Sequence, residues 1–166
     1  IKLNENSPPK VSEKTYSIVK QNFTNPQDID QNNLLVFENN LSFETTDFKD
    51  FKFKKIYLIS NKNENRSIKL NEKVIEFKSH LIKDQEQRIK NQSIECEIKD
   101  ISEVKNIGEN IVGLYPTVGE NLDYLNSNNI KLNFLYRKFD QYSWQYCNKG
   151  FFNFKNYIPK IITMFT

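Results

Sequence analysis

The sequence contains no alanine, and only 3 arginines and 4 glycines. Alanine, glycine and arginine have GC-rich codons, whereas the abundant asparagine, lysine and isoleucine have AT-rich codons. We therefore interpret the 23 asparagines as the composition of an AT-rich genome. A prion-like tract is the competing interpretation, but the asparagines are interleaved with isoleucine, leucine and phenylalanine throughout, so a folded chain is expected.

Long apolar runs are also missing. The longest, Ile56–Ile59 and Ile158–Ile162, are far below the roughly 18 residues needed to cross a bilayer, so no membrane span is predicted. Only Cys96 and Cys147 are present, too few for a disulfide scaffold. They are either free or joined in one bridge, and a reducing compartment is favoured.

Charge of one sign does not dominate. The net charge is +3, with basic and acidic residues matched over most of the length, which argues against a protein that coats a phosphate backbone. Four Asn-x-Ser/Thr sequons occur, and at this asparagine content we attribute them to chance. They lie at Asn22, Asn40, Asn65 and Asn91.

The residue sets that usually perform catalysis are absent. His80 is the single histidine, and three Cys/His residues spread over 80–147 do not suit a zinc site. The glycines at 108, 113 and 119 do not form a phosphate-binding loop. The sequence therefore predicts a protein that is not an enzyme and that has no cofactor and no metal.

The length suits one domain, preceded by an N-terminal arm over residues 1–32 that contains Ser7-Pro8-Pro9 and the turn at Asn25-Pro26. Residues 33–166 are predicted to form that domain with a C-terminal extension. Strands are predicted over 34–37, 48–59, 74–77, 93–104 and 130–139, with 54–70 as a hairpin. A helix is predicted from Ser79 to about Asn91. The glycine-containing loop region 105–129 is expected to hold a small strand at 111–115 and a helical stretch at 119–126.

Because strands dominate this prediction, the expected fold class is all-β with one or two short helices, arranged as a small, partly open barrel. In the strand over 93–104, Ile94, Cys96 and Ile98 are expected on one face, with Glu95 and Glu97 on the solvent face as edge protection.

The predicted elements resemble an oligonucleotide/oligosaccharide-binding (OB) fold. The resemblance is a pattern of strands over roughly residues 33–140. Within the OB family, this segment is similar to the OB domains of telomere-end and telomerase-recruitment proteins. It rests on Lys55–Ser60, Arg66–Leu70, Val74–Phe77, the helix, Ser93–Asp100 and a closing strand at Lys131–Phe139. Because members of that group often dock to protein partners, the resemblance implies a binding role.

An aromatic row is the main candidate site. In an extended Gln141–Tyr146, the rings of Tyr142, Trp144 and Tyr146 would share one face, with Arg137 and Lys138 upstream to meet phosphate. Such a row suits either stacking of unpaired bases or a core or protein interface. The low net charge favours the second interpretation.

The predicted function is a non-enzymatic accessory or scaffold subunit of a nucleoprotein complex such as telomerase, acting mainly through protein–protein contacts. Its partners would be other subunits or single-stranded nucleic acid, and its location intracellular, the nucleus rather than an organelle. The alternative is a lineage-specific accessory subunit of an organellar complex with no nucleic-acid contact. A secreted domain with a Cys96–Cys147 bridge and used sequons is the third class.

Overall fold

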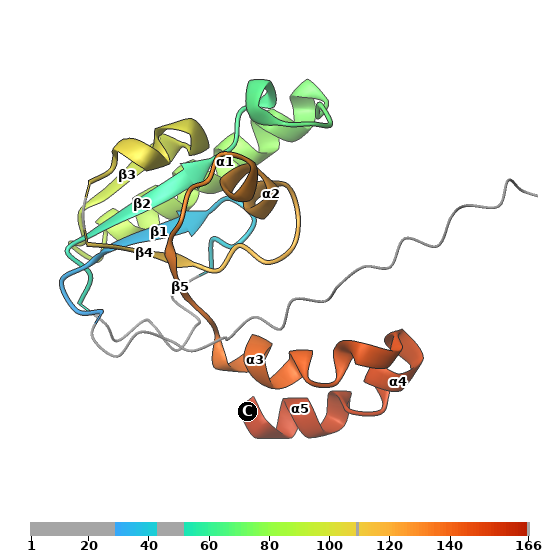
Figure 1. Cartoon of the computed structure of the whole chain (residues 1–166). Helices are drawn as coiled ribbons and strands as arrows, with labels where there is room; N and C mark the ends of the chain where they lie inside the picture. Colours follow the sequence, from blue (N-terminus) through green and yellow to red (C-terminus); the bar gives the residue numbers. More distant parts are fainter. Residues whose placement is uncertain (1–28, 43–51, 109, 166) are drawn as a thin grey trace, which may run out of the picture.

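The computed structural model of the chain describes residues 29–42, 52–108 and 110–165. Its centre is an open sheet of five parallel strands in the order β3-β2-β1-β4-β5 (Figure 1). The strands are β1 Asn33–Phe37, β2 Lys55–Ser60, β3 Cys96–Asp100, β4 Ile111–Leu114 and β5 Asn133–Leu135. The predicted all-β, OB-like barrel is therefore wrong, because the described chain is an α/β fold whose edge strands do not close on each other.

Helices lie between and after the strands of this sheet. They are η2 Asn63–Asn65, α1 Glu72–Lys90, η3 Ile101–Asn106, α2 Glu120–Ser127, α3 Lys138–Trp144, η4 Cys147–Lys149, α4 Phe151–Lys155 and α5 Ile158–Phe165. In Figure 1, α3, α4 and α5 form a separate layer beside the sheet.

The predicted hairpin over 54–70 and the strand over 74–77 are wrong. After β2 the chain turns through η2 and enters α1, so residues 74–77 are helical. The Asn71 side chain caps this helix by accepting a hydrogen bond from the Lys73 backbone N–H at 3.0 Å. The cap and the following run of strong helix formers outweigh the strand preference of Val74 and Ile75. Consequently the helix predicted from Ser79 is present but begins at Glu72.

Several other elements are confirmed, some of them in shorter form. The strand at 34–37 is β1, and the small strand and helical stretch within 105–129 are β4 and α2. The strands over 93–104 and 130–139 shrink to β3 and β5, and the chain continues into η3 and α3 respectively. Residues 1–28 of the arm predicted over 1–32, and residues 48–51 of the strand predicted over 48–59, lie outside the described residues. The described part of that strand is shortened to β2.

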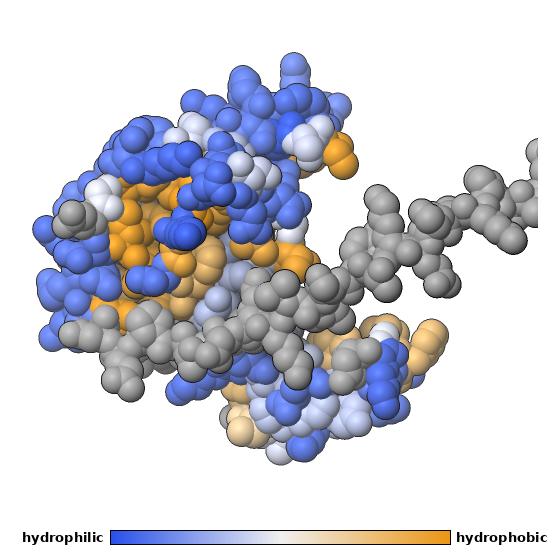
Figure 2. Space-filling model, viewed as in Figure 1, coloured by the Kyte–Doolittle hydropathy of each residue, from blue (hydrophilic) through white to orange (hydrophobic). Residues whose placement is uncertain are grey.

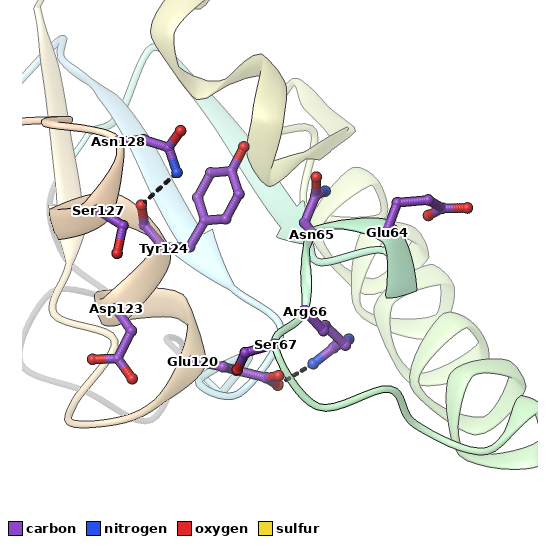
Figure 3. Close-up of a pocket in the computed structure, with 9 residues that line it drawn as sticks. All are labelled: Glu64, Asn65, Arg66, Ser67, Glu120, Asp123, Tyr124, Ser127 and Asn128. Carbon is purple, nitrogen blue, oxygen red and sulfur yellow. Dashed lines mark hydrogen bonds and ion pairs between the residues drawn. The ribbon is translucent and has the colours of Figure 1, made fainter.

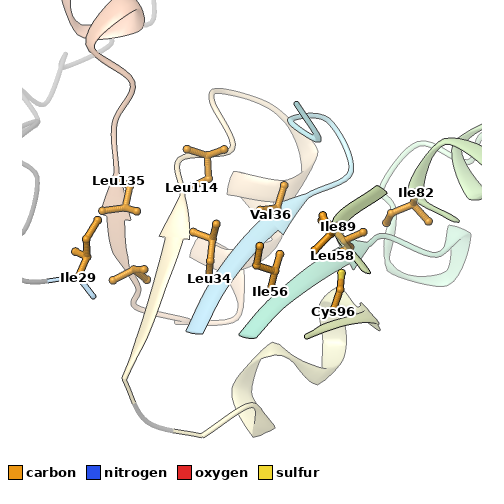
Figure 4. Close-up of a cluster of buried hydrophobic side chains, with 11 residues drawn as sticks. Ile29, Leu34, Val36, Ile56, Leu58, Ile82, Ile89, Cys96, Leu114 and Leu135 are labelled. Atoms are coloured by element: carbon orange, nitrogen blue, oxygen red, sulfur yellow. The ribbon is translucent and has the colours of Figure 1, made fainter. Parts of the chain in front are cut away.

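The sheet has an apolar side-chain layer on each face, because alternate residues of a strand point in opposite directions. On one face, strand residues pack against Ile82 and Ile89 of α1 (Figure 4). The strand residues of that cluster are Leu34, Val36, Ile56, Leu58, Cys96, Val112, Leu114 and Leu135. On the other face, Leu35, Phe37 and Ile59 pack with Leu125 of α2 and Ile101 of η3. Both thiols are free, with Cys96 buried in the α1 layer and Cys147 exposed.

The face opposite α1 is covered less completely. Figure 2 shows apolar side chains on it between η3 and α2. Tyr57, Ile107, Ile111 and Leu132 are only partly buried there. Parallel sheets are usually covered on both faces. Between β3 and β4 the chain forms the six-residue η3 in place of a full helix, so no described residue fully covers this part of the face.

The edge strand β3 is lined by ion pairs, as edge protection predicts. The Lys55 ammonium lies 2.8 Å from carboxylate oxygens of both Glu95 and Glu97, and the Lys99 ammonium lies 2.7 Å from Glu97. Hydrogen bonds from Lys55 and then Lys99 lower the pKa of Glu97 from 4.5 to about 2. These pairs favour the charged carboxylate in the folded protein.

We therefore expect Glu97→Gln to destabilise the protein at neutral pH by no more than about 1 kcal/mol, because the pairs are solvent-exposed. A lowered folded-state pKa stabilises above the unfolded pKa, so this contribution is present above a pH of about 5 and disappears as the pH falls toward about 2. Urea unfolding of both proteins across this range measures it. A difference between variant and parent that is constant with pH would contradict the assignment.

Candidate functional site

Polar side chains gather where the central strands end. Glu38 directly follows β1, Asn61 directly follows β2, and Asp100 ends β3. The carboxyl ends of parallel strands lie at one edge of a sheet, and open α/β sheets bind their ligands at that edge. Glu120 and Asn121 begin α2, which follows β4 at the same edge.

Glu38 is the centre of this group. One carboxylate oxygen, Oε1, accepts hydrogen bonds from Arg66 and, at 2.7 Å, from the Lys78 ammonium. The other oxygen, Oε2, accepts from the Asn61 backbone N–H at 3.0 Å. The side chain of Glu38 is only 4 % exposed and that of Arg66 is fully buried. Buried charges at this depth persist only when they are paired, and here both carboxylate oxygens are engaged.

Arg66 links three segments of the chain. Its guanidinium pairs with Glu38 after β1 and Glu120 of α2, and donates to the Asn61 carbonyl at 2.6 Å. Burial alone lowers the pKa of this guanidinium, but the hydrogen bonds to Glu120 and Glu38 outweigh it and the pKa is raised overall. Arg66 is therefore a permanent positive charge that holds the carboxyl edge together.

Three amide side chains form a hydrogen-bonded series beside these charges. Asn39 Nδ2 donates to the Pro116 carbonyl at 2.6 Å, and Asn121 Nδ2 donates to Asn39 Oδ1 at 2.9 Å. Asn61 Nδ2 then donates to Asn121 Oδ1 at 3.1 Å. The series ends at Asn61 Oδ1, which is buried and has no hydrogen-bond partner among the described residues.

A cavity of about 220 Å³ opens between α1 and this edge of the sheet. Its polar lining includes Glu38, Asn61 and Lys78. Its apolar lining comprises Ile75, Ile82 and Ile98.

Charge in and around the cavity is unequal. Glu38 and Glu120 are matched by Arg66 and Lys78, which lie within ion-pair distance of both carboxylates. The exposed Lys62 and Lys83 also line the cavity. Counted over the lining residues alone, Lys62, Lys78 and Lys83 exceed Glu38 by two positive charges, and Asp100 lies just outside the lining, where it accepts a hydrogen bond from the Lys62 backbone N–H. The lining is therefore suited to an anion.

A second, more polar cavity of about 430 Å³ lies on the other side of Arg66. Figure 3 shows the Arg66–Glu120 pair at one end of it and the ring of Tyr124 along its wall. Its acidic residues Glu64 and Asp123 are exposed.

The residues predicted from sequence lie elsewhere, in the C-terminal helical layer. Tyr142 and Trp144 belong to α3, Lys138 begins that helix, and Arg137 precedes it. The prediction that 141–146 is extended is wrong, so Tyr142, Trp144 and Tyr146 do not share one face of a strand.

Trp144 contacts one group of rings, whereas Tyr142 and Tyr146 contact each other and belong to another group. The Trp144 ring centroid lies 5.7 Å from Tyr115 and 6.3 Å from Tyr136. Tyr146 stacks on Tyr157 at 4.3 Å, with Tyr142 at 5.6 Å in an edge orientation. Trp144 thus packs against two buried tyrosines, and the binding role of the row stays a prediction.

Sequence reasoning missed the carboxyl-edge residues. Their signal was present: Glu38 directly follows the apolar run Leu34–Phe37, and Asn61 follows Ser60 at the end of the apolar run Ile56–Ile59. No helix in the described part of the chain is long and apolar enough to cross a membrane. Within that part, no group of three or more His, Cys, Asp or Glu side chains could hold a metal ion.

A scan against protein-family models, a search of curated proteins and a search of solved structures each found no match to this chain.

Proposed function

We propose that this chain is a non-enzymatic binding protein whose ligand is a small organic anion held in the cavity between α1 and the carboxyl edge of the sheet. One observation carries the proposal. The cavity is lined by three lysines, Lys62, Lys78 and Lys83, and by a single carboxylate, Glu38, which also pairs with Arg66. The position supports it as well, because open parallel sheets bind ligands at the carboxyl ends of their strands.

The geometry of Glu38 supports binding over catalysis. A general base or nucleophile needs a free lone pair directed at the substrate. Glu38 accepts three hydrogen bonds from the protein, two of them from cations, so three of its roughly four acceptor positions are already occupied. Glu38 therefore holds Lys78 in place, and Lys78 is the group that faces the anion.

The size and apolar lining of the cavity define suitable probes. Phenylacetate and phenyl phosphate each join an anionic group to a ring that could contact Ile75, Ile82 and Ile98. We expect both to bind in ligand-observed NMR, and the uncharged benzyl alcohol to bind much more weakly. Lys78→Met should weaken binding of the anions by about tenfold or more, since a charge-assisted hydrogen bond contributes about 1.5–3 kcal/mol.

Lys90→Met is the matched control, because Lys90 lies on the same helix and pairs with Glu86 outside the cavity. Equal binding of benzyl alcohol and phenylacetate, or no binding of any anion by the full chain, would overturn the proposal.

A second function, contact with other protein subunits, is the one expected from the sequence. Several apolar side chains of the C-terminal helices support it, because Phe151 is 65 %, Phe152 85 % and Met164 63 % exposed. Membership of a nucleoprotein or organellar complex stays a prediction from the sequence.

A further inference from the structure

The C-terminal helical layer, residues 137–165, carries the net positive charge of the chain. It contains five basic residues and a single acidic one, Asp140. Because the whole chain has 24 basic and 21 acidic residues, the rest of it is close to neutral. An AT-rich genome explains the use of lysine in place of arginine, but it does not explain the shortage of acidic residues in this layer. The basic residues are Arg137 and four exposed lysines, Lys138, Lys149, Lys155 and Lys160.

The same layer exposes large apolar side chains in two groups. Phe151 and Phe152 begin α4, and their ring centroids lie 5.8 Å apart. The second group comprises Phe139 of α3 and Phe165 of α5, whose centroids lie 5.4 Å apart, together with the exposed Met164. Figure 1 places α4 and the C-terminal end of α5 at opposite ends of the layer, and Figure 2 shows apolar side chains at both ends.

Lysines border both apolar groups in the sequence. Lys149 and Lys155 lie on either side of the Phe151–Phe152 pair, and Lys138 directly precedes Phe139. This combination suits the surface of an anionic bilayer. Apolar side chains can enter the boundary of the acyl chains, while the ammonium groups of neighbouring lysines stay at the level of the lipid phosphates.

A bilayer fits this arrangement better than other anionic or apolar partners do. A second copy of the chain would present the same positive charge, so the two layers would repel each other. Stacking of unpaired bases needs open ring faces, whereas Phe151 and Phe152 meet edge to face and Met164 has no ring. A folded protein would have to be complementary in shape to apolar groups at both ends of the layer. Fluid lipid adapts to both groups without such complementarity.

We propose that the C-terminal helical layer binds the surface of an anionic phospholipid bilayer. Phe151 and Phe152 are its apolar anchors, and Lys149 and Lys155 contact the lipid phosphates. This inference does not rest on the anion cavity. It names lipid, in place of other protein subunits, as the partner of these exposed side chains.

Sedimentation of the full chain with lipid vesicles tests the proposal. We expect binding to phosphatidylcholine vesicles that contain about one-third phosphatidylserine, at least about tenfold weaker binding to phosphatidylcholine alone, and release as the salt concentration rises. Phe151→Ser combined with Phe152→Ser should weaken binding by about tenfold or more, because each ring buries apolar surface in the bilayer. Lys149→Gln combined with Lys155→Gln should weaken it by about tenfold as well, because two attractions to the anionic surface are lost.

Matched controls lie on α1, outside the layer. Phe77 is 61 % exposed, close to the 65 % of Phe151, so Phe77→Ser should leave vesicle binding unchanged. Lys73→Gln replaces another exposed lysine and should also have no effect. The proposal is overturned if the phosphatidylserine vesicles are not bound, or if the variants of the layer bind them as tightly as the controls do.

A single-stranded oligonucleotide, titrated in parallel, identifies the alternative. If the oligonucleotide binds through Lys149 and Lys155 while the vesicles do not, the surface belongs to nucleic acid and the bilayer proposal is overturned. If neither probe binds, the proposal is overturned in favour of protein subunits as the partner.

Discussion

Replacing Arg66 by methionine is expected to lower the free energy of unfolding by about 3 kcal/mol. The substitution removes the guanidinium that pairs with Glu38 and Glu120, and leaves Glu38 buried with Lys78 as its remaining cation. Removing one partner of a buried ion pair costs about 3–5 kcal/mol, because the other charge stays buried and undercompensated. We expect the lower end of this range because Lys78 still donates to Glu38.

Urea unfolding monitored by circular dichroism measures the loss, and two further variants define its cause. Glu38→Gln combined with Arg66→Met should be more stable than the sum of the single effects predicts, since the uncompensated charge is then absent. Lys90→Met, which breaks an exposed pair on α1, should leave the urea midpoint almost unchanged. An Arg66→Met protein as stable as the Lys90→Met protein would show that the cluster contributes little to folding.

The positions of most described elements follow from the sequence, but the direction in which the strands pair does not. Leu34–Phe37 and Ile56–Ile59 are continuous apolar runs, which are typical of parallel strands buried on both faces. The apolar residues at 68, 70, 74 and 75 also fit antiparallel strands, and for this reason the sequence was interpreted as a barrel. Residue-by-residue strand preferences do not show that Asn71 caps a helix. With the helix beginning there, α1 becomes the crossover between the parallel strands β2 and β3.

The candidate site could be predicted only in part, for a related reason. That Glu38 and Asn61 end consecutive strands is visible in the sequence, and in a parallel sheet this alone would place them together. Their pairing with Arg66 and Lys78, and the amide series through Asn39 and Asn121, joins residues up to 82 positions apart. Such contacts depend on the strand order and direction. They cannot be predicted when the strands are assumed to be antiparallel.

The aromatic row shows the opposite error, because it was predicted to be extended and the structure places Tyr142 and Trp144 in a helix. Its binding role stays a prediction. Alternation of Tyr142, Trp144 and Tyr146 has significance only in an extended chain. In a helix, residues two apart point in different directions, and here they contact different neighbours. Aromatic content alone therefore did not distinguish a binding surface from internal packing.

Trp144→Ala tests that distinction, and is expected to loosen the C-terminal helical layer from the sheet. The Trp144 ring packs edge-on against Tyr115, which follows β4, and against Tyr136, which follows β5. Both tyrosines are less than 10 % exposed, at 8 % and 9 %. Because the indole itself is only half-buried, we expect a loss of about 2 kcal/mol, below the 3–5 kcal/mol of a fully buried ring.

Hydrogen exchange locates the effect. Backbone amides of α3 and α5 should exchange faster in Trp144→Ala, because a local opening reaction becomes easier, while amides of β1 and β2 at the sheet centre change little. Phe152→Ala is the control, since Phe152 is 85 % exposed and its removal should leave exchange in α3 unchanged. If instead Trp144→Ala leaves the exchange of α3 and α5 unaltered but weakens binding of a single-stranded oligonucleotide, then Trp144 is a contact residue, as base stacking requires, and the helical layer is held to the sheet by other side chains.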